Sequence, residues 1–174
     1  MNQEYFKNSI RKIPDFPKQG ILYYDLTTAF KDPKCLHFIS DSLVNLYKDR
    51  GITKVIGIES RGFIAAANLA EKLNAGFVPI RKKGKLPAES YKLSYDLEYG
   101  SACIEIHKDA IDKNDVVLIH DDLLATGGTM EAAIELVKMF HVEQIYINFL
   151  VELDFLNGRA ILPKDVKIES LVHF

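Results

Sequence analysis

The chain has 174 residues, of which 48% are hydrophobic and 26% charged, and this is the composition of an ordinary globular domain. Its formal net charge of −2 excludes a broad basic surface for nucleic acid, so any phosphate group would have to bind at a local cluster. Two distant cysteines, a polar amino-terminal segment and the lack of a run of about 18 apolar residues favour one cytoplasmic domain, residues 1–174, with no membrane partner.

Helical and strand patterns alternate along the chain without a linker or an internal repeat, which predicts an α/β domain. Asp32-Pro33 is typical of a helix start, and Gly51 is typical of the end of that helix. The predicted buried stripe of this helix consists of apolar side chains, namely Leu36, Ile39, Leu43, Leu46 and Tyr47. Residues 54–58 then predict a strand, and residues 63–74 predict a helix that ends at Gly76.

The second half of the chain is predicted to consist mainly of strands. Residues 77–80 predict one strand, and over residues 91–106 apolar and polar side chains alternate on both sides of a central glycine, which is typical of a β-hairpin. Residues 116–120 and 145–151 complete a predicted parallel core, and residues 166–174 are a candidate last strand. The order of the strands at the edges of the sheet does not follow from these patterns.

Residues 116–129 carry the most informative motif. An apolar, β-branched run ends in Asp121 and Asp122, and a Thr-Gly-Gly-Thr loop then leads into a helical pattern. Open α/β sheets bind ligands at the carboxyl ends of their strands, and the N–H groups at a helix amino terminus hold phosphate. Two carboxylates beside a phosphate indicate a ribose diol, because an ionised carboxylate only accepts hydrogen bonds. The alternative is a strand-to-helix turn in which Asp122 and Thr126 only cap the helix.

The segments on either side of the acid pair complete this prediction. The residues expected to hold the phosphate form one loop: Ala125, Thr126, Gly127, Gly128 and Thr129. The helix that follows has apolar positions at roughly helical spacing, namely Met130, Ala133, Ile134, Val137 and Met139. His120 directly precedes the two acids, and we expect a buried, hydrogen-bonded side chain without a catalytic role. The other four histidines lack metal-ligand spacing, so no zinc site is predicted.

A second loop, residues 59–62, also follows a strand and precedes a helix, which makes it a candidate anion site. Gly57 and Gly62 have the first spacing of a P-loop, but Phe63 stands where that motif requires lysine, which excludes a P-loop nucleotidase. Two interpretations of Arg61 stay open. Its guanidinium could grip a pyrophosphate bidentately, or it could face solvent and pair with Glu59.

Arg81, Lys82, Lys83 and Lys85 place four cations directly after a predicted strand. By themselves they are typical of a solvated basic turn or of a weak nucleic-acid patch. Beside a pyrophosphate they would instead clamp a leaving group that carries several negative charges.

Together these motifs resemble those of the adenine phosphoribosyltransferases, within the type I phosphoribosyltransferase family. The resemblance covers positions 15 to 159 in the family's order, and its segments are residues 15–17 with Asp25 downstream, 57–63, 81–87, 97–100 and 116–129. It implies the type I phosphoribosyltransferase fold, an α/β fold with a mainly parallel sheet flanked by helices. It also implies an amino-terminal hood at about residues 1–30 and a flexible catalytic loop at about residues 84–101.

The resemblance implies a purine-salvage reaction in which adenine and 5-phospho-α-D-ribose 1-diphosphate give AMP and pyrophosphate. Mg²⁺ would be held mainly by the donor and by water, without dedicated protein ligands, and the protein would be a homodimer. Two alternatives stay open. One is transfer to hypoxanthine, guanine or xanthine, and the other is a non-catalytic regulator that senses the donor. A regulator would be expected to carry a DNA-binding segment or a broad basic face.

The resemblance also implies roles for single residues. Glu98 would be the acid/base carboxylate, although strand alternation alone would make it an exposed position. Tyr99 would pack on the loop or the ligand, or would be a core aromatic. Arg61 and Lys85 would take part in catalysis, with a cis peptide bond before Ser60. The remaining substrate contacts would be Asp121 and Asp122 on the ribose, and Ser60, Arg81 and Lys82 on the pyrophosphate.

The purine base would be recognised by the hood, residues 15–25. Its irregular backbone could read the adenine edge, while Ile21 and Leu22 pack on the faces of the ring. Tyr24 stands where the family usually has arginine, and Gln19 stands where it often has proline. A backbone contact would tolerate Tyr24, whereas a side-chain contact there would change the base preference.

Overall fold

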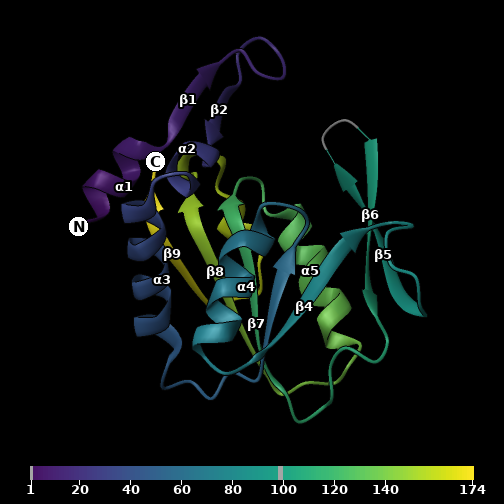
Figure 1. Ribbon diagram of the computed structural model, residues 1–174. Coiled ribbons are helices and arrows are strands. Elements are labelled where there is room, and N and C mark those ends of the chain that lie inside the picture. Colours follow the sequence, from purple (N-terminus) through teal and green to yellow (C-terminus); the bar gives the residue numbers. More distant parts are fainter. Residues whose placement is uncertain (1, 98–99) are drawn as a thin grey trace.

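The computed structural model describes residues 2–97 and 100–174, and its centre is a seven-stranded sheet (Figure 1). The strand order is β5-β6-β4-β3-β7-β8-β9. The strands of the parallel part are β3 (Lys54–Ile58), β4 (Gly76–Lys82), β7 (Val116–Leu124), β8 (Gln144–Glu152) and β9 (Lys167–His173). The antiparallel edge is a hairpin of β6 (Gly100–His107), which pairs with β4, and β5 (Ser90–Leu97). The predicted hairpin and parallel core are thus confirmed.

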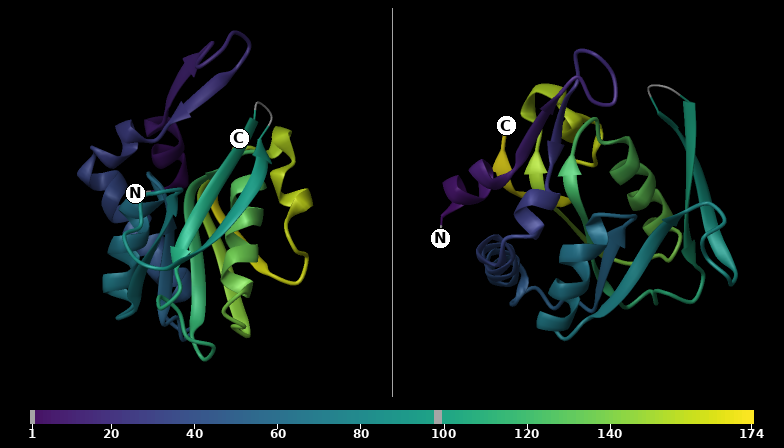
Figure 2. Two further views of the ribbon diagram at one scale, coloured as in Figure 1. Left: turned by 90° about the vertical axis from the view of Figure 1, so that its right-hand side faces the viewer. Right: turned by 45° about the horizontal axis from the view of Figure 1, so that its top comes forward.

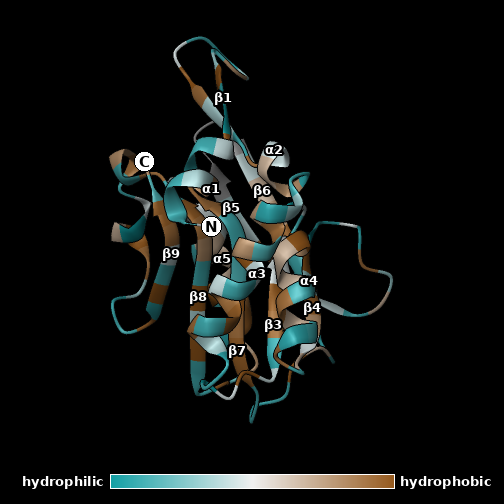
Figure 3. Cartoon of the chain, turned by 60° about the vertical axis from the view of Figure 1, so that its left-hand side comes forward, coloured by the Kyte–Doolittle hydropathy of each residue, from teal (hydrophilic) through white to brown (hydrophobic). Residues whose placement is uncertain are grey.

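Helices cover both faces of the parallel strands. α3 (Pro33–Tyr47) and α4 (Gly62–Lys72) pack on one face, and α5 (Gly128–Lys138) packs on the other. Successive residues of a strand point to opposite faces, so Val55 belongs to the core under α4 while Ile56 belongs to the core under α5. Burial on both faces explains the continuous apolar runs at residues 55–58 of β3 and 116–119 of β7, and Figure 3 shows brown segments in the central strands, between the helices.

The hood rises above the carboxyl ends of the parallel strands (Figures 1 and 2). It consists of α1 (Gln3–Ser9), the antiparallel strands β1 (Arg11–Pro14) and β2 (Leu22–Asp25), and α2 (Thr27–Phe30). Two short 3-10 helices, η1 (Asp154–Leu156) and η2 (Gly158–Ile161), connect β8 to the segment before β9. The predicted limits of the hood and of a flexible loop at about 84–101 stay predictions.

Three details of the sequence prediction are wrong. The buried stripe of α3 runs through Cys35, Ile39, Leu43 and Tyr47, and Leu36 is 40% exposed because it lies about 100° around the helix from Cys35. Met139 lies beyond the last turn of α5 and is exposed. α4 ends at Lys72 and the chain turns at Asn74, whose φ is 54°, so Gly76 is free to begin β4.

No helix in the described part of the chain is both long enough and apolar enough to span a membrane.

Candidate active site

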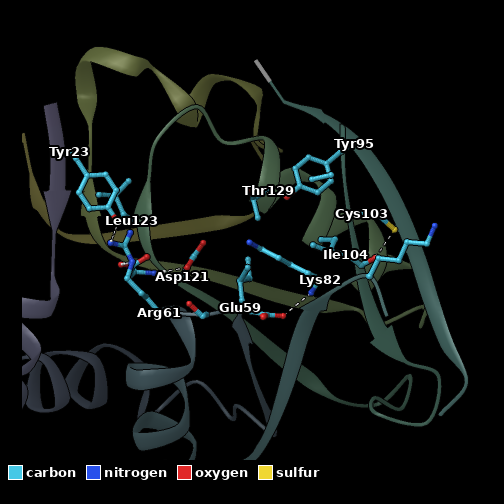
Figure 4. Close-up of a pocket in the computed structure, with 15 residues that line it drawn as sticks. Tyr23, Glu59, Arg61, Lys82, Tyr95, Cys103, Ile104, Asp121, Leu123 and Thr129 are labelled. Carbon is cyan, nitrogen blue, oxygen red and sulfur yellow. Dashed lines mark hydrogen bonds and ion pairs between the residues drawn. The ribbon is translucent and has the colours of Figure 1, made fainter. Parts of the chain in front are cut away.

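A cavity of about 710 Å³ opens at the carboxyl ends of the parallel strands, between the hood and the β5–β6 hairpin (Figure 4). Its lining comes from six parts of the chain: Tyr23 of β2, residues 58–61 at the end of β3, residues 82–83 at the end of β4, residues 95 and 102–104 of the hairpin, residues 121–123 of β7, and Thr129 of α5. Segments that are far apart in the sequence therefore meet in one hollow, as expected for an open α/β sheet.

The acid pair lies in the floor of this cavity. Asp122 is 4% exposed, and its Oδ2 lies 2.7 Å from Nε of Arg61. The N–H of Asp122 donates to Oδ1 of Asp121 over 2.9 Å, and Asp121 is half-buried. Burial and the neighbouring Asp122 carboxylate raise the pKa of Asp121 well above its usual range. Burial also raises the pKa of Asp122, although the Arg61 guanidinium opposes this shift.

Arg61 joins the acid pair to the hood. Its Nη1 donates to the hydroxyl of Tyr23 over 2.7 Å, while Nε pairs with Asp122. Glu59 is engaged elsewhere, since its Oε2 accepts from Nε of Arg81 over 3.2 Å and from the N–H of Lys82 over 2.9 Å. Arg61 therefore pairs with Asp122 of β7, the strand next to β3, and not with Glu59. The peptide bond between Glu59 and Ser60 is cis, as the resemblance implied.

The loop of residues 125–129 adjoins the cavity and lines a smaller hollow of about 80 Å³ at the amino terminus of α5. Gly127 has a φ of 92°, which a residue with a side chain rarely adopts, and it allows the chain to turn directly into the helix. Among the described residues, no side chain caps α5, so Asp122 and Thr126 are not helix caps there. The first turn of α5 lines this hollow, and the first N–H groups of a helix have no partner within the helix, so an anion could bind there.

The cation cluster is only partly directed at the cavity. Lys82 and Lys83 line it, and Figure 4 shows Lys82 extending toward Asp121 and Thr129. Arg81 is held by Glu59. Lys85 is not among the described residues that line the cavity, because the turn that carries it folds back onto Glu105 of β6.

Glu105 is an important residue that sequence reasoning missed. It is fully buried, and its carboxylate accepts the N–H groups of Lys85 (3.0 Å) and Leu86 (3.1 Å), the Ser90 hydroxyl (3.3 Å) and an ion pair from Lys92 (3.2 Å). Burial by itself would raise the pKa of Glu105, but the Leu86 N–H, the Lys92 ammonium and the Lys85 N–H outweigh it and lower the pKa to about 2. One carboxylate therefore anchors the whole turn between β4 and β5.

Glu105→Gln should lower the free energy of unfolding at pH 7 by about 3 kcal/mol, because the buried carboxylate accepts from two N–H groups, a hydroxyl and the half-exposed Lys92 ammonium, and hydrogen bonds to a charged group are the stronger ones. A lowered pKa means that ionised Glu105 stabilises the fold above the ordinary value of 4.5 and that this contribution is lost as the pH falls toward about 2. Urea unfolding at pH 7 and pH 3 measures the difference, which should shrink at pH 3. Glu135→Gln, at an exposed pair on α5, is the control, and an equal effect of both substitutions would contradict the anchor.

The hood presents Tyr23 to the cavity and turns Tyr24 away from it. Tyr24 is 6% exposed and packs on the ring of Phe174, with 4.6 Å between the ring centroids. Leu22 is 41% exposed and, like Tyr24, is not among the described residues that line the cavity. Because neighbouring side chains of a strand point to opposite sides, the burial of Tyr24 directs Tyr23 toward Arg61. The residue of β2 at the cavity is therefore Tyr23, which lies between the two predicted residues, Leu22 and Tyr24.

Three further residues were predicted to lie at or near the site: Glu98, Tyr99 and His120. Glu98 and Tyr99 lie outside the described residues, between the ends of β5 and β6. His120 is fully buried and its Nδ1 lies 2.8 Å from Oδ1 of Asn148, which confirms the expected burial and hydrogen bond. Burial lowers the pKa of His120 to about 4, so the ring is neutral at pH 7.

Within the described ranges, one group of side chains has the geometry of a metal site: Glu152, Asp154 and His173. Glu152 is already engaged, because Arg159 pairs with its carboxylate and the Ser170 hydroxyl donates to it over 2.6 Å. This cluster therefore ties β8 to β9, and it does not present free ligands for a cation.

Comparison with known proteins agrees with this geometry. Residues 28–166 match the family described as phosphoribosyl transferase domain. An adenine phosphoribosyltransferase of Bacteroides thetaiotaomicron is 60% identical over 172 residues, which cover 99% of this chain and 98% of that protein. The crystal structure of adenine phosphoribosyltransferase from Rhodothermus marinus is 48% identical with a TM-score of 0.93, and the alignment covers 99% of this chain and 98% of that one.

A further solved structure is that of the Giardia lamblia enzyme complexed with 9-deazaadenine, which is 43% identical with a TM-score of 0.95 and is aligned over 100% of this chain and 98% of that chain. These relatives share the whole length of the chain, from the hood to β9, and not only the phosphoribosyl-binding core. The chain therefore belongs to the adenine phosphoribosyltransferase family.

Proposed function

We propose that this chain transfers the phosphoribosyl group of 5-phospho-α-D-ribose 1-diphosphate to adenine, giving AMP and pyrophosphate in purine salvage. One observation carries the proposal. The cavity holds the pair of Asp121 and Asp122 between a tyrosine of the hood and the amino terminus of α5, and the two hollows share Asp121, Leu123 and Thr129. An elongated ligand with a base, a ribose and a phosphate matches that sequence of groups.

The donor would be held by β7 and the loop that follows it. Residues 125–129 would bind the 5-phosphate through backbone N–H groups, as helix amino termini do. Asp121 and Asp122 would accept hydrogen bonds from the two ribose hydroxyls. Asp121 lines both hollows, so its carboxylate lies where the ribose would join the two halves of the ligand.

The pyrophosphate would lie between Ser60, Arg61 and Lys82, all of which line the cavity. Their positive charge and hydrogen-bond donors would stabilise the charge that develops on the leaving group. Lys83 also lines the cavity and extends this set. Arg81 and Lys85 would bind the pyrophosphate only after the turn between β4 and β5 moves. In this structure Arg81 pairs with Glu59, and Lys85 is not among the described residues that line the cavity.

The adenine ring would pack on Tyr23, the residue through which the hood reaches the cavity. Glu98 would exchange a proton with the purine, as the family resemblance implies. Tyr95 and Ala102 face each other in the same hairpin and line the cavity, which supports a role for this hairpin beside the ligand. Exclusion of water at this stage would prevent wasteful hydrolysis of the donor.

Magnesium suits the oxygen donors of this site. Mg²⁺ usually keeps several waters and binds through one or two carboxylates together with substrate phosphates, and Asp121 and Asp122 are such carboxylates. When bound, the ion would neutralise charge on the donor oxygens. The residues of the chain would orient the ribose and stabilise the leaving group as described above.

The protein would act as a cytoplasmic homodimer. The two cysteines, Cys35 and Cys103, are free thiols, which supports a reducing compartment. Leu36 and Ile64 are 40% and 45% exposed and line a hollow of about 530 Å³ between α3 and α4, where a second copy could cover them.

With each purine base supplied in turn, AMP should form from adenine and the donor only in the presence of a divalent metal. The kcat/KM for hypoxanthine and guanine should be at least ~10²-fold lower than for adenine. A site that binds an exocyclic amine has polar groups of the protein left unpaired when an oxo group replaces that amine. A product assay with and without a chelator measures both effects. Equal or faster turnover of hypoxanthine would exclude the adenine assignment, and a lack of product with every base would favour a regulator that senses the donor.

A further inference from the structure

The phosphate loop rests directly on the backbone of Gly158 in η2. A Cβ atom added at Gly158 would lie 2.0 Å from the carbonyl oxygen of Ala125 and 3.0 Å from the carbonyl carbons of Ala125 and Thr126. Conversely, a Cβ atom added at Gly127 would lie 2.5 Å from the carbonyl oxygen of Gly158. The phosphate loop and η2 are thus in backbone contact. Each contributes a glycine to this contact, Gly127 and Gly158, and neither position has room for a methyl group.

The segment that carries Gly158 is fixed from behind. Arg159 follows Gly158, and its Nε donates to Oε1 of Glu152 over 2.9 Å while Nη1 donates to the carbonyl oxygen of Ile168 over 3.0 Å. Glu152 ends β8 and is 6% exposed, and Ile168 belongs to β9. These hydrogen bonds therefore hold η2 in place against the loop. η2 also packs beside α5 (Figure 2).

Ile161 supports the loop from the same segment. Its side chain would meet a Cβ atom at Gly127 at 3.0 Å, so it lies in contact with that glycine, although 46% of its surface stays exposed. The loop is thus bounded by α5 on one side and by η2 on the other. Its N–H groups can be aimed at one point in space only while both supports stay in place.

We infer that Gly158 is a positioning residue for the 5-phosphate, because it sets the depth at which residues 125–128 approach the ligand. This inference rests on the proposed assignment of the 5-phosphate to that loop. Any side chain at position 158 pushes the carbonyl of Ala125 outward, and the N–H groups next to it lose their direction. A hydrogen bond to a phosphate oxygen weakens steeply when its angle or length changes, so a shift of about 1 Å is enough.

Gly158→Ala tests the inference, with the affinities of AMP, adenosine and adenine measured by titration calorimetry. In the wild type the ratio of the AMP and adenosine affinities reports the contribution of the phosphate. In Gly158→Ala this ratio should fall at least ~10-fold, as for the loss of one hydrogen bond to a charged group, while adenine and adenosine bind as before. The KM for the donor should rise more than kcat falls.

Gly76→Ala is the matched control, since it adds the same methyl group at the start of β4, where the nearest atom is Cδ of the flexible Lys54 side chain at 3.2 Å. A wild-type ratio in Gly158→Ala would overturn the inference and leave the proposed function intact. Equal affinities of wild-type protein for AMP and adenosine would instead overturn the phosphate assignment itself, and the inference with it.

Should Gly158→Ala fail to fold in a thermal melt, Ile161→Ala decides the question. Ile161 is half exposed, so the fold tolerates its truncation, but the contact that supports Gly127 is removed. The ratio of AMP to adenosine affinity should then fall by several-fold, about the effect of a weakened hydrogen bond. An unchanged ratio in this variant would show that η2 does not position the loop.

Discussion

Replacing Glu98 by glutamine should lower the rate of a single turnover by roughly 10²–10⁴-fold, which is the usual contribution of a positioned acid or base. Glutamine keeps the shape of the side chain and much of its hydrogen bonding, but it cannot take up or release the proton of the purine at neutral pH. Affinity for the donor should therefore persist while turnover falls. The change affects the chemical step and not the binding of the phosphoribosyl group.

The rate must be measured in a single turnover with donor and adenine both saturating, because product release or loop opening can limit the steady-state rate. Glu71→Gln, an exposed position on α4 whose carboxylate pairs with Lys72, is the control and should react like the wild type. A single-turnover rate of Glu98→Gln within about threefold of wild type would remove Glu98 from the reaction. Catalysis would then depend on the cations of the cavity alone.

Asp122→Asn should weaken use of the donor by roughly 10–10²-fold, which is the value of one hydrogen bond to a charged group. The amide removes a charged acceptor for the ribose, and it also removes the partner that lies 2.7 Å from Nε of Arg61. Adenine affinity should change far less, because Tyr23 and not Asp122 would contact the base, and Arg61 keeps its hydrogen bond to the Tyr23 hydroxyl. The substitution should thus weaken the use of the donor far more than the binding of adenine.

Donor KM, together with donor and adenine affinities from calorimetry, measures this separation. Asp109→Asn is a control, since Asp109 is exposed in the segment after β6. If donor affinity and turnover of Asp122→Asn matched those of the control, the acid pair would have no contact with the ribose. Asp122 would then serve only to hold Arg61 at the start of α4.

The place of the acid pair is determined by the sequence alone. Residues 116–119 are apolar without interruption because the strand is buried on both faces, and the acids follow where β7 reaches the edge of the cavity. Two glycines then allow the turn into α5, which begins at Gly128. Burial, turn and helix start are local properties, so their order in the chain is enough to predict a ligand site there.

The partners of the charged groups are decided by the tertiary structure. Arg61, at the start of α4, pairs with Asp122 of β7, although Glu59 is only two residues away in the sequence. Glu105 occupies a polar position of an alternating strand, which predicts exposure, yet the turn between β4 and β5 folds over it and buries it completely. A strand pattern gives the face of a side chain but not what covers that face.

The choice between Tyr23 and Tyr24 is decided in the same way, because a strand presents alternate residues to opposite sides and the sequence does not say which side meets the cavity. Packing of Tyr24 on Phe174 makes that choice. The contact of Gly158 with residues 125–128 likewise joins segments that are distant in the chain and carry no shared motif. The sequence by itself determined the strands, the loops and the phosphoribosyl motif, since these depend on local periodicity and turns. Only the tertiary structure decided which side chains meet across the cavity, because those contacts depend on how the strands are ordered and what lies over them.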